Sequence, residues 1–324
     1  MTHPILFSII IANYNKADNI PALLSSVYDN YPHDDFEVVF MDDASIDSSV
    51  EEARCFPARI FVSESNLGPA TLRNMAVKEA RGEFLLFMDS DVILAQDTML
   101  NFRNLCLSKK FDAVLGLEVL PPVIDNWIGT FRTLQINDSW GEYRTKETVV
   151  EAWGTTFGAM RRELFVSIGG FNEKYKSADV EDHELAAHIH GDQVILFAPS
   201  LAYRHSYHGA AELMIKQFRR ASQMVKFKKK VLFTHSLYGW RFKISHLLAA
   251  AVFAGSLASI FDYRLLYFVI AMLLLRAGSN HYLLSQALKV KGVAFAVYCF
   301  AISLIMSLCI VSGAVYGKLK WSQK

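Results

Sequence analysis

Two carboxylates stand two residues apart directly after an apolar run, at Phe87-Met88-Asp89-Ser90-Asp91. If the extended backbone continues through them, Asp89 and Asp91 point to the same face. Ligands of open α/β sheets bind at the carboxyl ends of strands, and paired carboxylates there suit a hard divalent cation that bridges phosphate oxygens. Taken alone, this spacing favours a simpler alternative, a helix cap followed by a solvated loop acid.

Polar residues also follow two other predicted strands. Ala12-Asn13-Tyr14-Asn15 ends the first, and Met41-Asp42-Asp43-Ala44-Ser45 ends the second. Because neighbouring strands finish at one sheet edge, an Asp there can accept from a base N–H and Tyr14 can stack on the base. Either segment alone is better explained as turn residues. Arg73 follows Gly68-Pro69 and is either a phosphate ligand or a surface arginine.

A third acidic segment, Val180-Glu181-Asp182-His183-Glu184-Leu185, opens a predicted helix far along the chain. Such a carboxylate pair can do acid–base chemistry, or it can simply complement the helix dipole.

These side chains need a sheet to position them. β-branched and apolar runs predict strands, and capping residues followed by helical spacing predict helices. The alternation of strand and helix favours a mostly parallel sheet with helices on both faces. The order blurs after about residue 120, where Pro121-Pro122 interrupts the pattern. The expected strands are 7–12, 36–41, 60–62, 84–88 and 194–197. One expected helix starts near residues 18–21, and the others cover 69–80, 97–107 and 180–190. A further element is expected at 152–160.

The net charge of +1 over 324 residues is the sum of two opposed halves. Residues 1–215 hold 17 Lys and Arg against 31 Asp and Glu, a formal charge of −14, whereas residues 216–324 hold 16 against Asp262 alone, a charge of +15. The near-neutral charge balance and the aromatic content of 13% exclude a disordered chain. Two differently charged halves indicate two modules with separate tasks.

The second half resembles a membrane-associated segment. Residues 216–243 carry nine Lys and Arg and no acid, with an apolar stripe at helical spacing. This pattern favours a basic amphipathic helix on an anionic membrane surface over a solvated basic face or a nucleic-acid patch. Two charge-free stretches, 244–261 and 293–316, then approach or exceed the length of a membrane span, and 265–275 is shorter. We expect two or three membrane helices.

Six motifs in order resemble glycosyltransferase family 2 over roughly residues 5–210. They are IIIANYN, VVFMDDAS, NLGPATLRN, FLLFMDSD, GAMRRELFVSIGGFNE and VEDHEL. The resemblance implies an α/β GT-A (Rossmann-like) fold and inverting transfer of a sugar from a nucleoside diphosphate sugar. It also implies Mg²⁺ or Mn²⁺ as cofactor, and we favour a UDP sugar over a GDP sugar.

The same resemblance implies roles for individual residues. Asp182 would be the catalytic base with Glu181 beside it, and His205 would lie near the metal or diphosphate, with His208 as its rival and a structural histidine as the alternative. The remaining implied roles are base and ribose contacts for Ala12, Tyr14 and Asp43, diphosphate contacts for Arg73, nucleotide contacts for Asp89 and Ser90, metal ligation for Asp89 and Asp91, and an acceptor-side position for Trp153 and Gly154.

Two departures from the family pattern refine the expectation. Ala44 stands where relatives usually have glycine, and Gln217-Phe218-Arg219-Arg220-Ala221 lacks the tryptophan of the processive synthases' QxxRW motif. Single-sugar transfer to a hydroxyl of a lipid-linked or membrane-proximal glycan is therefore favoured over polymerisation. The alternatives are a polyprenyl-phosphate sugar synthase, whose acceptor would be a phosphate, and a catalytically silent membrane scaffold.

The expected organisation has three parts. Residues 1–210 form the GT-A domain, 211–243 the basic amphipathic segment, and 244–324 the membrane region. The N-terminus lacks a basic leader and a cleavage site, so we expect a multi-pass protein with its catalytic domain on the cytoplasmic face. The expected partners are the nucleotide sugar, the glycan acceptor and an anionic membrane, without nucleic acid, and the sequence allows a homo-oligomer.

Overall fold

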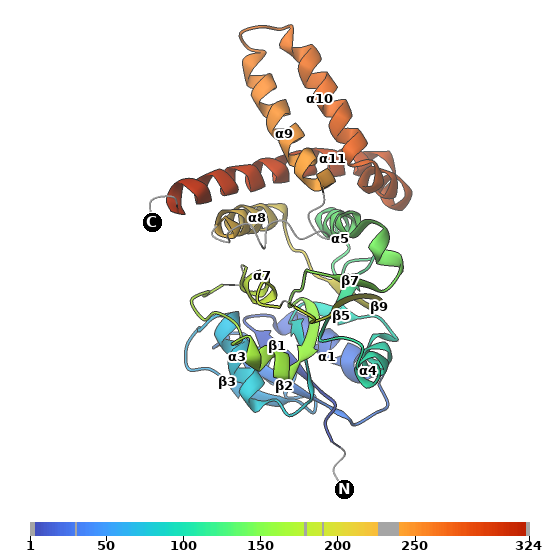
Figure 1. Ribbon diagram of the computed structural model, residues 1–324, viewed down its shortest axis with the longest axis vertical. Coiled ribbons are helices and arrows are strands. Elements are labelled where there is room, and N and C mark those ends of the chain that lie inside the picture. Colours follow the sequence, from blue (N-terminus) through green and yellow to red (C-terminus); the bar gives the residue numbers. More distant parts are fainter. Residues whose placement is uncertain (1–3, 30, 178–179, 190, 226–239, 322–324) are drawn as a thin grey trace. The chain divides into compact units, whose positions relative to one another are not determined.

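The chain forms two compact units in a computed structural model (Figure 1). Unit 1 comprises Met1–Ile124 and Glu142–Ser206, and unit 2 comprises Asp125–Gly141 and Tyr207–Lys324. The structure describes residues 4–29, 31–177, 180–189, 191–225 and 240–321.

Unit 1 is built on one mixed sheet with the strand order β3-β2-β1-β4-β8-β6-β9-β5, and β7 pairs with β9. Strands β3, β2, β1 and β4 run parallel, as does the β6–β9 pair, but β8 runs antiparallel to both β4 and β6. Strands β5 and β7 also lie antiparallel to β9. The strands are β1 Phe7–Asn13, β2 Phe36–Asp42, β3 Arg59–Val62, β4 Phe84–Asp89, β5 Val92–Leu94, β6 Ala113–Glu118, β7 Thr148–Val150, β8 Phe157–Arg161 and β9 Ile195–His205.

The expectation of a mostly parallel sheet is therefore wrong for its second half. After β4 the chain turns back within Ser90-Asp91, which is too short for the crossover that a parallel connection needs. Strand β8 then enters between β4 and β6 in the opposite direction. The α/β class itself is confirmed.

Apolar side chains alternate across the sheet and fill two layers of core. Phe7 of β1 points to one face, where Phe102 of α4 meets it edge-on at 5.0 Å between ring centroids. Phe87 of β4 points to the other face and packs edge-on against Trp153 at 5.7 Å and Phe171 at 5.3 Å. Helices thus cover both faces, because each face carries its own apolar set.

The helices of unit 1 begin where the sequence supplies start signals. Helix α3 follows Gly68, whose positive φ of 88° and contact with the Lys176 backbone leave no room for a side chain, and Pro69 fixes its first turn. The helices are α1 Ile20–Tyr28, α2 Ser49–Ala53, α3 Pro69–Glu79, α4 Thr98–Ser108, α6 Arg162–Ser167 and α7 Glu181–Ala186, with 3-10 turns at Ala17–Asn19 and Gly141–Thr145.

All the regular secondary structure in the described residues of unit 2 is helical. A break at Gly292, with φ 81° and ψ −170°, divides its last helix. The predicted basic segment 211–243 is described only in part, as α8 and the first residues of α9, because residues 226–239 lie outside the described ranges. The helices are α5 Trp127–Trp140, α8 Ala210–Met224, α9 Trp240–Ala258, α10 Leu265–Ser279 and α11 His281–Trp321.

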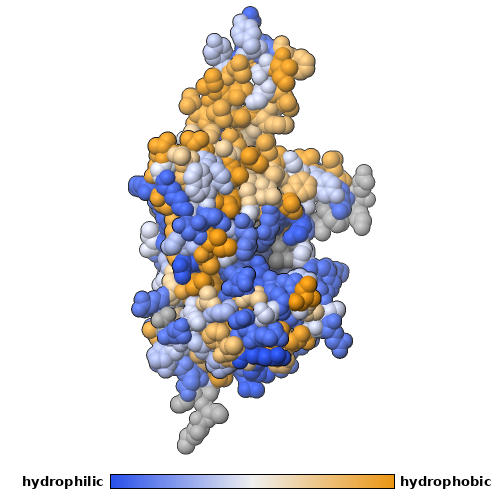
Figure 2. Space-filling model, turned by 180° about the vertical axis from the view of Figure 1, so that it is seen from behind, coloured by the Kyte–Doolittle hydropathy of each residue, from blue (hydrophilic) through white to orange (hydrophobic). Residues whose placement is uncertain are grey.

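One helix in the described part of the chain, His281–Lys320 within α11, is long and apolar enough to cross a membrane. Lys243–Ala258 and Leu265–Ser279 are apolar but shorter. Large apolar side chains are nevertheless exposed along α9 and α10, and Figure 2 shows this helical hairpin coated mostly in hydrophobic residues. Phe261, at the tip between the two helices, is 92% exposed.

Helices α8 and α11 approach each other closely through small residues. A Cβ added at Gly313 would collide with the backbone of Phe218, and one added at Gly317 would collide with the backbone of Ser222. The two glycines and their two partners are each four residues apart, so each pair lies on one helix face. This spacing lets two helix backbones pack at short range, as GxxxG pairs do in membranes.

A buried guanidinium ties α9, α10 and α11 together. Arg276 of α10, 1% exposed, donates to the backbone oxygen and hydroxyl of Ser245 on α9. It also donates to Ser303 and Ser307 on α11, at 2.8 Å to the Ser303 carbonyl and 3.0 Å to the Ser307 hydroxyl. These neutral acceptors fix the three apolar helices in one arrangement.

Candidate active site

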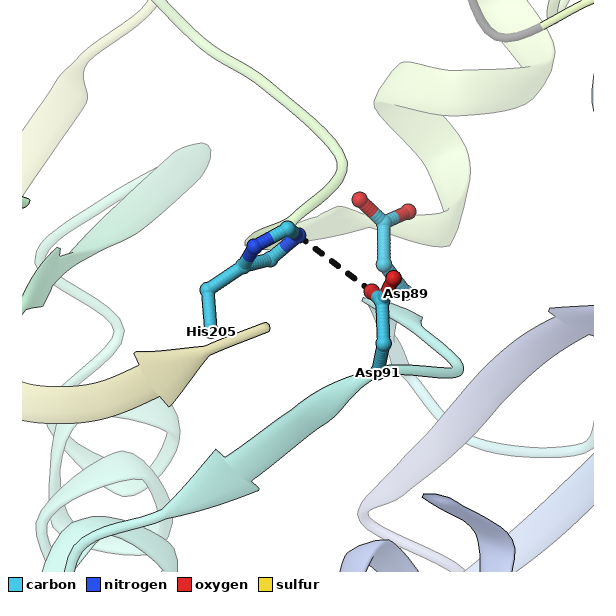
Figure 3. Close-up of side chains that lie close together, drawn as sticks. All are labelled: Asp89, Asp91 and His205. Carbon is cyan, nitrogen blue, oxygen red and sulfur yellow. Dashed lines mark ion pairs between the residues drawn. The ribbon is translucent and has the colours of Figure 1, made fainter. Parts of the chain in front are cut away.

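The paired carboxylates lie at the carboxyl edge of the sheet, in unit 1 (Figure 3). Asp89 ends β4, and Asp91 lies in the turn that precedes β5. Antiparallel pairing places Val92 of β5 opposite His205 of β9, and Ser206 N donates to Asp91 O at 3.1 Å. The extended backbone does not continue through Asp91, and the turn instead brings Asp91 to His205.

Asp89, Asp91 and His205 together could hold a metal ion. One ligand atom from each lies within 4.8 Å of the others, and His205 Nε2 is 3.2 Å from Asp91 Oδ1. Ligands about 2.1 Å from a common ion are roughly 3–4 Å apart, so small side-chain adjustments would complete such a site. Two carboxylates and one imidazole fit Mn²⁺ well, and Mg²⁺ prefers the oxygens.

The electrostatic environment keeps Asp91 ionised. Burial by itself would raise the pKa of the Asp91 carboxyl, but His205 and Lys16 hold that pKa well below its ordinary value. Burial lowers the pKa of His205, but the Asp91 carboxylate, with smaller effects from Glu118 and Asp89, raises it above 6.5 overall.

The structure separates the two candidate histidines. His205 belongs to the three-residue group and has a side chain that is 12% exposed. His208 is exposed and, within the described part of the chain, does not belong to that group.

Arg73 lies between two acidic motifs rather than on the surface. Its Nη1 donates to Glu181 Oε1 and its Nη2 donates to Asp89 Oδ1, both at 2.9 Å. The Arg73 and Glu181 side chains are only 4% and 3% exposed, and the guanidinium also lies 5.7 Å from the centre of the Phe171 ring. Arg73 therefore joins the first carboxylate of the pair to the helix that carries Asp182.

Asp182 lies beside Gly154. Its Oδ1 accepts from His183 N at 2.8 Å, and a Cβ added at Gly154 would lie 3.3 Å from its Oδ2. Trp153, by contrast, is 1% exposed and donates from Nε1 to Ala159 O at 3.0 Å. Trp153 is thus a core residue that fixes the backbone of Gly154, and Gly154 is the member of the pair that faces Asp182.

The residues expected to contact the nucleotide line the same edge. Tyr14, 48% exposed, follows the end of β1, where Ala12 is paired with Asp89 of β4. Ser90 is 7% exposed. Asp43 is buried, and its two oxygens accept from Leu67 N at 2.7 Å and Gly68 N at 2.9 Å, so it also holds the loop before α3.

Sequence reasoning missed Lys16. Its Nζ lies 3.2 Å from Asp91 Oδ2, on the carboxylate oxygen that His205 does not contact. The only available signal was its position directly after Ala12-Asn13-Tyr14-Asn15. A lone lysine has no diagnostic spacing, because only the turn of β4 into β5 brings Asp91 to it.

Comparison with known proteins gives consistent matches in sequence and in fold. The family model Glycosyl transferase family 2 matches residues 8–161. An uncharacterized glycosyltransferase of Haemophilus influenzae is 28% identical over 192 residues, which cover 55% of this chain and 60% of that protein. The poly(ribitol-phosphate) beta-N-acetylglucosaminyltransferase TarS of Staphylococcus aureus is 36% identical over 99 residues, or 29% of this chain and 17% of TarS. The chain therefore spans less than two thirds of these curated relatives.

Among solved structures, the mannosyltransferase PcManGT from Pyrobaculum calidifontis, in complex with GDP-Man and Mn²⁺, is similar with a TM-score of 0.55. The alignment covers 98% of this chain and 88% of PcManGT at 18% sequence identity. At that identity the likeness establishes a shared fold.

Proposed function

The chain belongs to glycosyl transferase family 2 through residues 8–161, and from this premise we propose that it transfers one sugar from a nucleoside diphosphate sugar to a hydroxyl of a lipid-linked or membrane-proximal glycan. The observation that carries the proposal is the meeting of Asp89, Asp91 and His205 at the carboxyl edge of the sheet. Asp182 is joined to the same edge through Glu181 and Arg73.

The donor would bind along this edge. Tyr14 is exposed enough to stack on a base, and Lys16, two residues later, contacts Asp91 of the carboxylate–histidine group, where the diphosphate would bind. Asp89, Asp91 and His205 would hold Mg²⁺ or Mn²⁺, which supplies Lewis-acid neutralisation of the departing diphosphate when bound. A UDP sugar is the first donor to test, with a GDP sugar second.

Asp182 would act as the base. Glu181 is buried and paired with Arg73, so it is poorly placed to receive a proton from an acceptor. Asp182 is less buried and its Oδ2 faces Gly154, where an acceptor hydroxyl could approach. It would take the hydroxyl proton as that oxygen bonds to the anomeric carbon and the bond to the diphosphate breaks, with inversion. Positive charge develops on the sugar ring in such a transition state.

The acceptor would be presented at a membrane. The support is the apolar length of His281–Lys320, the exposed apolar side chains of α9 and α10, and the docking of α8 on Gly313 and Gly317. A helix packed on the end of a span lies at the level of the lipid headgroups. We propose membrane attachment through unit 2, with unit 1 on the cytoplasmic face.

The test is sugar transfer by the detergent-solubilised full chain with Mn²⁺, a panel of UDP and GDP sugars, and either a lipid-linked glycan or polyprenyl phosphate as acceptor. We expect transfer to the glycan hydroxyl. Asp182→Asn should abolish transfer while leaving donor affinity unchanged, whereas Glu184→Gln, which removes the same charge from the same helix, should retain activity. Wild-type rates in Asp182→Asn would refute the base assignment. Transfer to polyprenyl phosphate alone would replace the proposed acceptor.

A further inference from the structure

Lys16 brings an ammonium group to the carboxylate edge. Its Nζ lies 3.2 Å from Asp91 Oδ2 while His205 Nε2 lies 3.2 Å from Asp91 Oδ1, so each oxygen of this carboxylate faces a different nitrogen group. The Lys16 side chain is 30% exposed and that of Asp91 15%. Lys16 is thus at the boundary between the buried carboxylate and the open edge of the sheet.

The backbone around Lys16 is fixed by side chains of the loop that follows β2 and of the first residue of α2. Lys16 N donates to Ser49 Oγ at 3.0 Å, Asn15 N to Ser45 Oγ at 2.9 Å and Ala17 N to Asp47 Oδ2 at 3.0 Å. Three consecutive backbone amides after β1 therefore donate hydrogen bonds to side chains of residues 45–49. Only the long side chain of Lys16 is left to move.

The position of Lys16 along the edge indicates what it binds. It lies two residues after Tyr14, the exposed aromatic residue, and its ammonium contacts Asp91 of the carboxylate–histidine group. A nucleotide with its base on Tyr14 and its diphosphate at Asp91 would pass its phosphates within reach of this ammonium. Charge-assisted hydrogen bonds to phosphate are short and strong, and a lysine supplies them as a mobile point charge.

We infer that Lys16 is a diphosphate-binding residue that exchanges Asp91 for the donor's phosphates. The inference rests on the proposed function. A cation on Asp91 competes with a divalent ion for the same carboxylate, so Lys16 weakens the binding of metal alone. Once the nucleotide is bound, the Lys16 ammonium leaves Asp91 and contacts a phosphate oxygen instead. There it stabilises the negative charge of the leaving diphosphate.

Opposite effects on two affinities distinguish this role from a structural one. In Lys16→Met, Mn²⁺ alone should bind about 2- to 5-fold more tightly, because a partly exposed ion pair no longer competes for Asp91. UDP or GDP in the presence of Mn²⁺ should bind about 10- to 100-fold more weakly, because a charge-assisted hydrogen bond is lost. A variant that merely loosened the loop would weaken both.

The experiment measures free Mn²⁺ by electron paramagnetic resonance and nucleotide affinity by calorimetry, on the full chain in detergent. Lys16→Arg should largely restore nucleotide binding, and Lys78→Met, which removes an exposed charge from α3, should match the wild type. Unchanged or equally weakened affinities in Lys16→Met overturn the inference. Absence of Mn²⁺ and nucleotide binding in the wild type would overturn the proposed function instead.

Discussion

Removal of Arg73 should destabilise the protein even without any ligand. The guanidinium is 4% exposed and bridges Glu181, 3% exposed, and Asp89 at 2.9 Å each. Arg73→Met keeps much of the side-chain length but leaves a buried carboxylate without its cation. Breaking a buried pair from one side costs about 3–5 kcal/mol of unfolding free energy.

The magnitude is large enough to measure by thermal unfolding. A domain of 150–250 residues loses about 2–4 °C in Tm per kcal/mol, so Arg73→Met should unfold about 6–20 °C below the wild type. Arg54→Met is the matched control, because Arg54 and its partner Glu51 are 65% and 63% exposed, and such surface pairs contribute about 0–1 kcal/mol.

A double variant separates loss of the ion pair from other damage. Arg73→Met with Glu181→Gln removes both buried charges, so it should be more stable than the sum of the two single changes implies. The experiment is circular dichroism of the detergent-solubilised chain without metal or nucleotide. If Arg73→Met melts within 1 °C of the wild type, Arg73 is not a structural bridge, and a ligand-only role on the diphosphate would be the better account.

Three further changes test other parts of the structure. Ala44 has φ 56°, a left-handed conformation that costs an L residue about 1–2 kcal/mol. Ala44→Gly should therefore stabilise the protein by about 0.5–1 kcal/mol, because the greater backbone entropy that glycine loses on folding offsets part of this gain. A lower urea midpoint for Ala44→Gly would contradict this. Mn²⁺ needs neutral His205, and the Asp91 carboxylate outweighs burial and raises the pKa of His205 above its ordinary value, so Mn²⁺ affinity should increase as pH rises through this raised pKa; His205→Gln should flatten the profile, and a flat wild-type profile would contradict the assignment. Gly317→Leu should displace α8 from α11 and lower the free energy of unfolding by about 1–3 kcal/mol. Val315 is exposed, so Val315→Leu should leave this free energy unchanged. Equal melting temperatures of the two variants would refute the close helix contact.

The parallel half of the sheet was readable from the sequence because its strands are buried on both faces. Continuous apolar runs predicted 7–12, 36–41 and 84–88, and each observed strand is one residue longer. The later strands were harder. The apolar run of strand β6 is interrupted by Gly116, which closely approaches the backbone of Leu201. Helix α5 is buried on several sides and so shows no amphipathic stripe.

Some residues of the candidate site could likewise be predicted from the local sequence, and others could not. The Asp89–Asp91 pair could be predicted because it ends an obvious strand. The contacts of Arg73 with Glu181, and of Lys16 with Asp91, depend on tertiary register and have no signature in local spacing. His205 was named only through the family resemblance, since the predicted strand 194–197 stopped well short of the end of β9.

The apolar helices of unit 2 show where sequence length and structure differ. The predicted span 293–316 lies within α11 after the break at Gly292, which composition could not reveal. The stretch 244–261 overlaps α9, which ends at Ala258 before the hairpin turns into α10. The fixing of these helices by Arg276 was also unforeseen, because a single arginine in an apolar run does not identify its partners.

The central claim is that Asp89, Asp91 and His205 hold a divalent ion on which nucleotide binding depends. The most direct measurement is UDP and GDP binding by the full chain, titrated with and without Mn²⁺, for the wild type and Asp91→Asn. We expect Mn²⁺ to tighten nucleotide binding strongly in the wild type and to have no such effect in Asp91→Asn. An equal response to Mn²⁺ in the two proteins would contradict it.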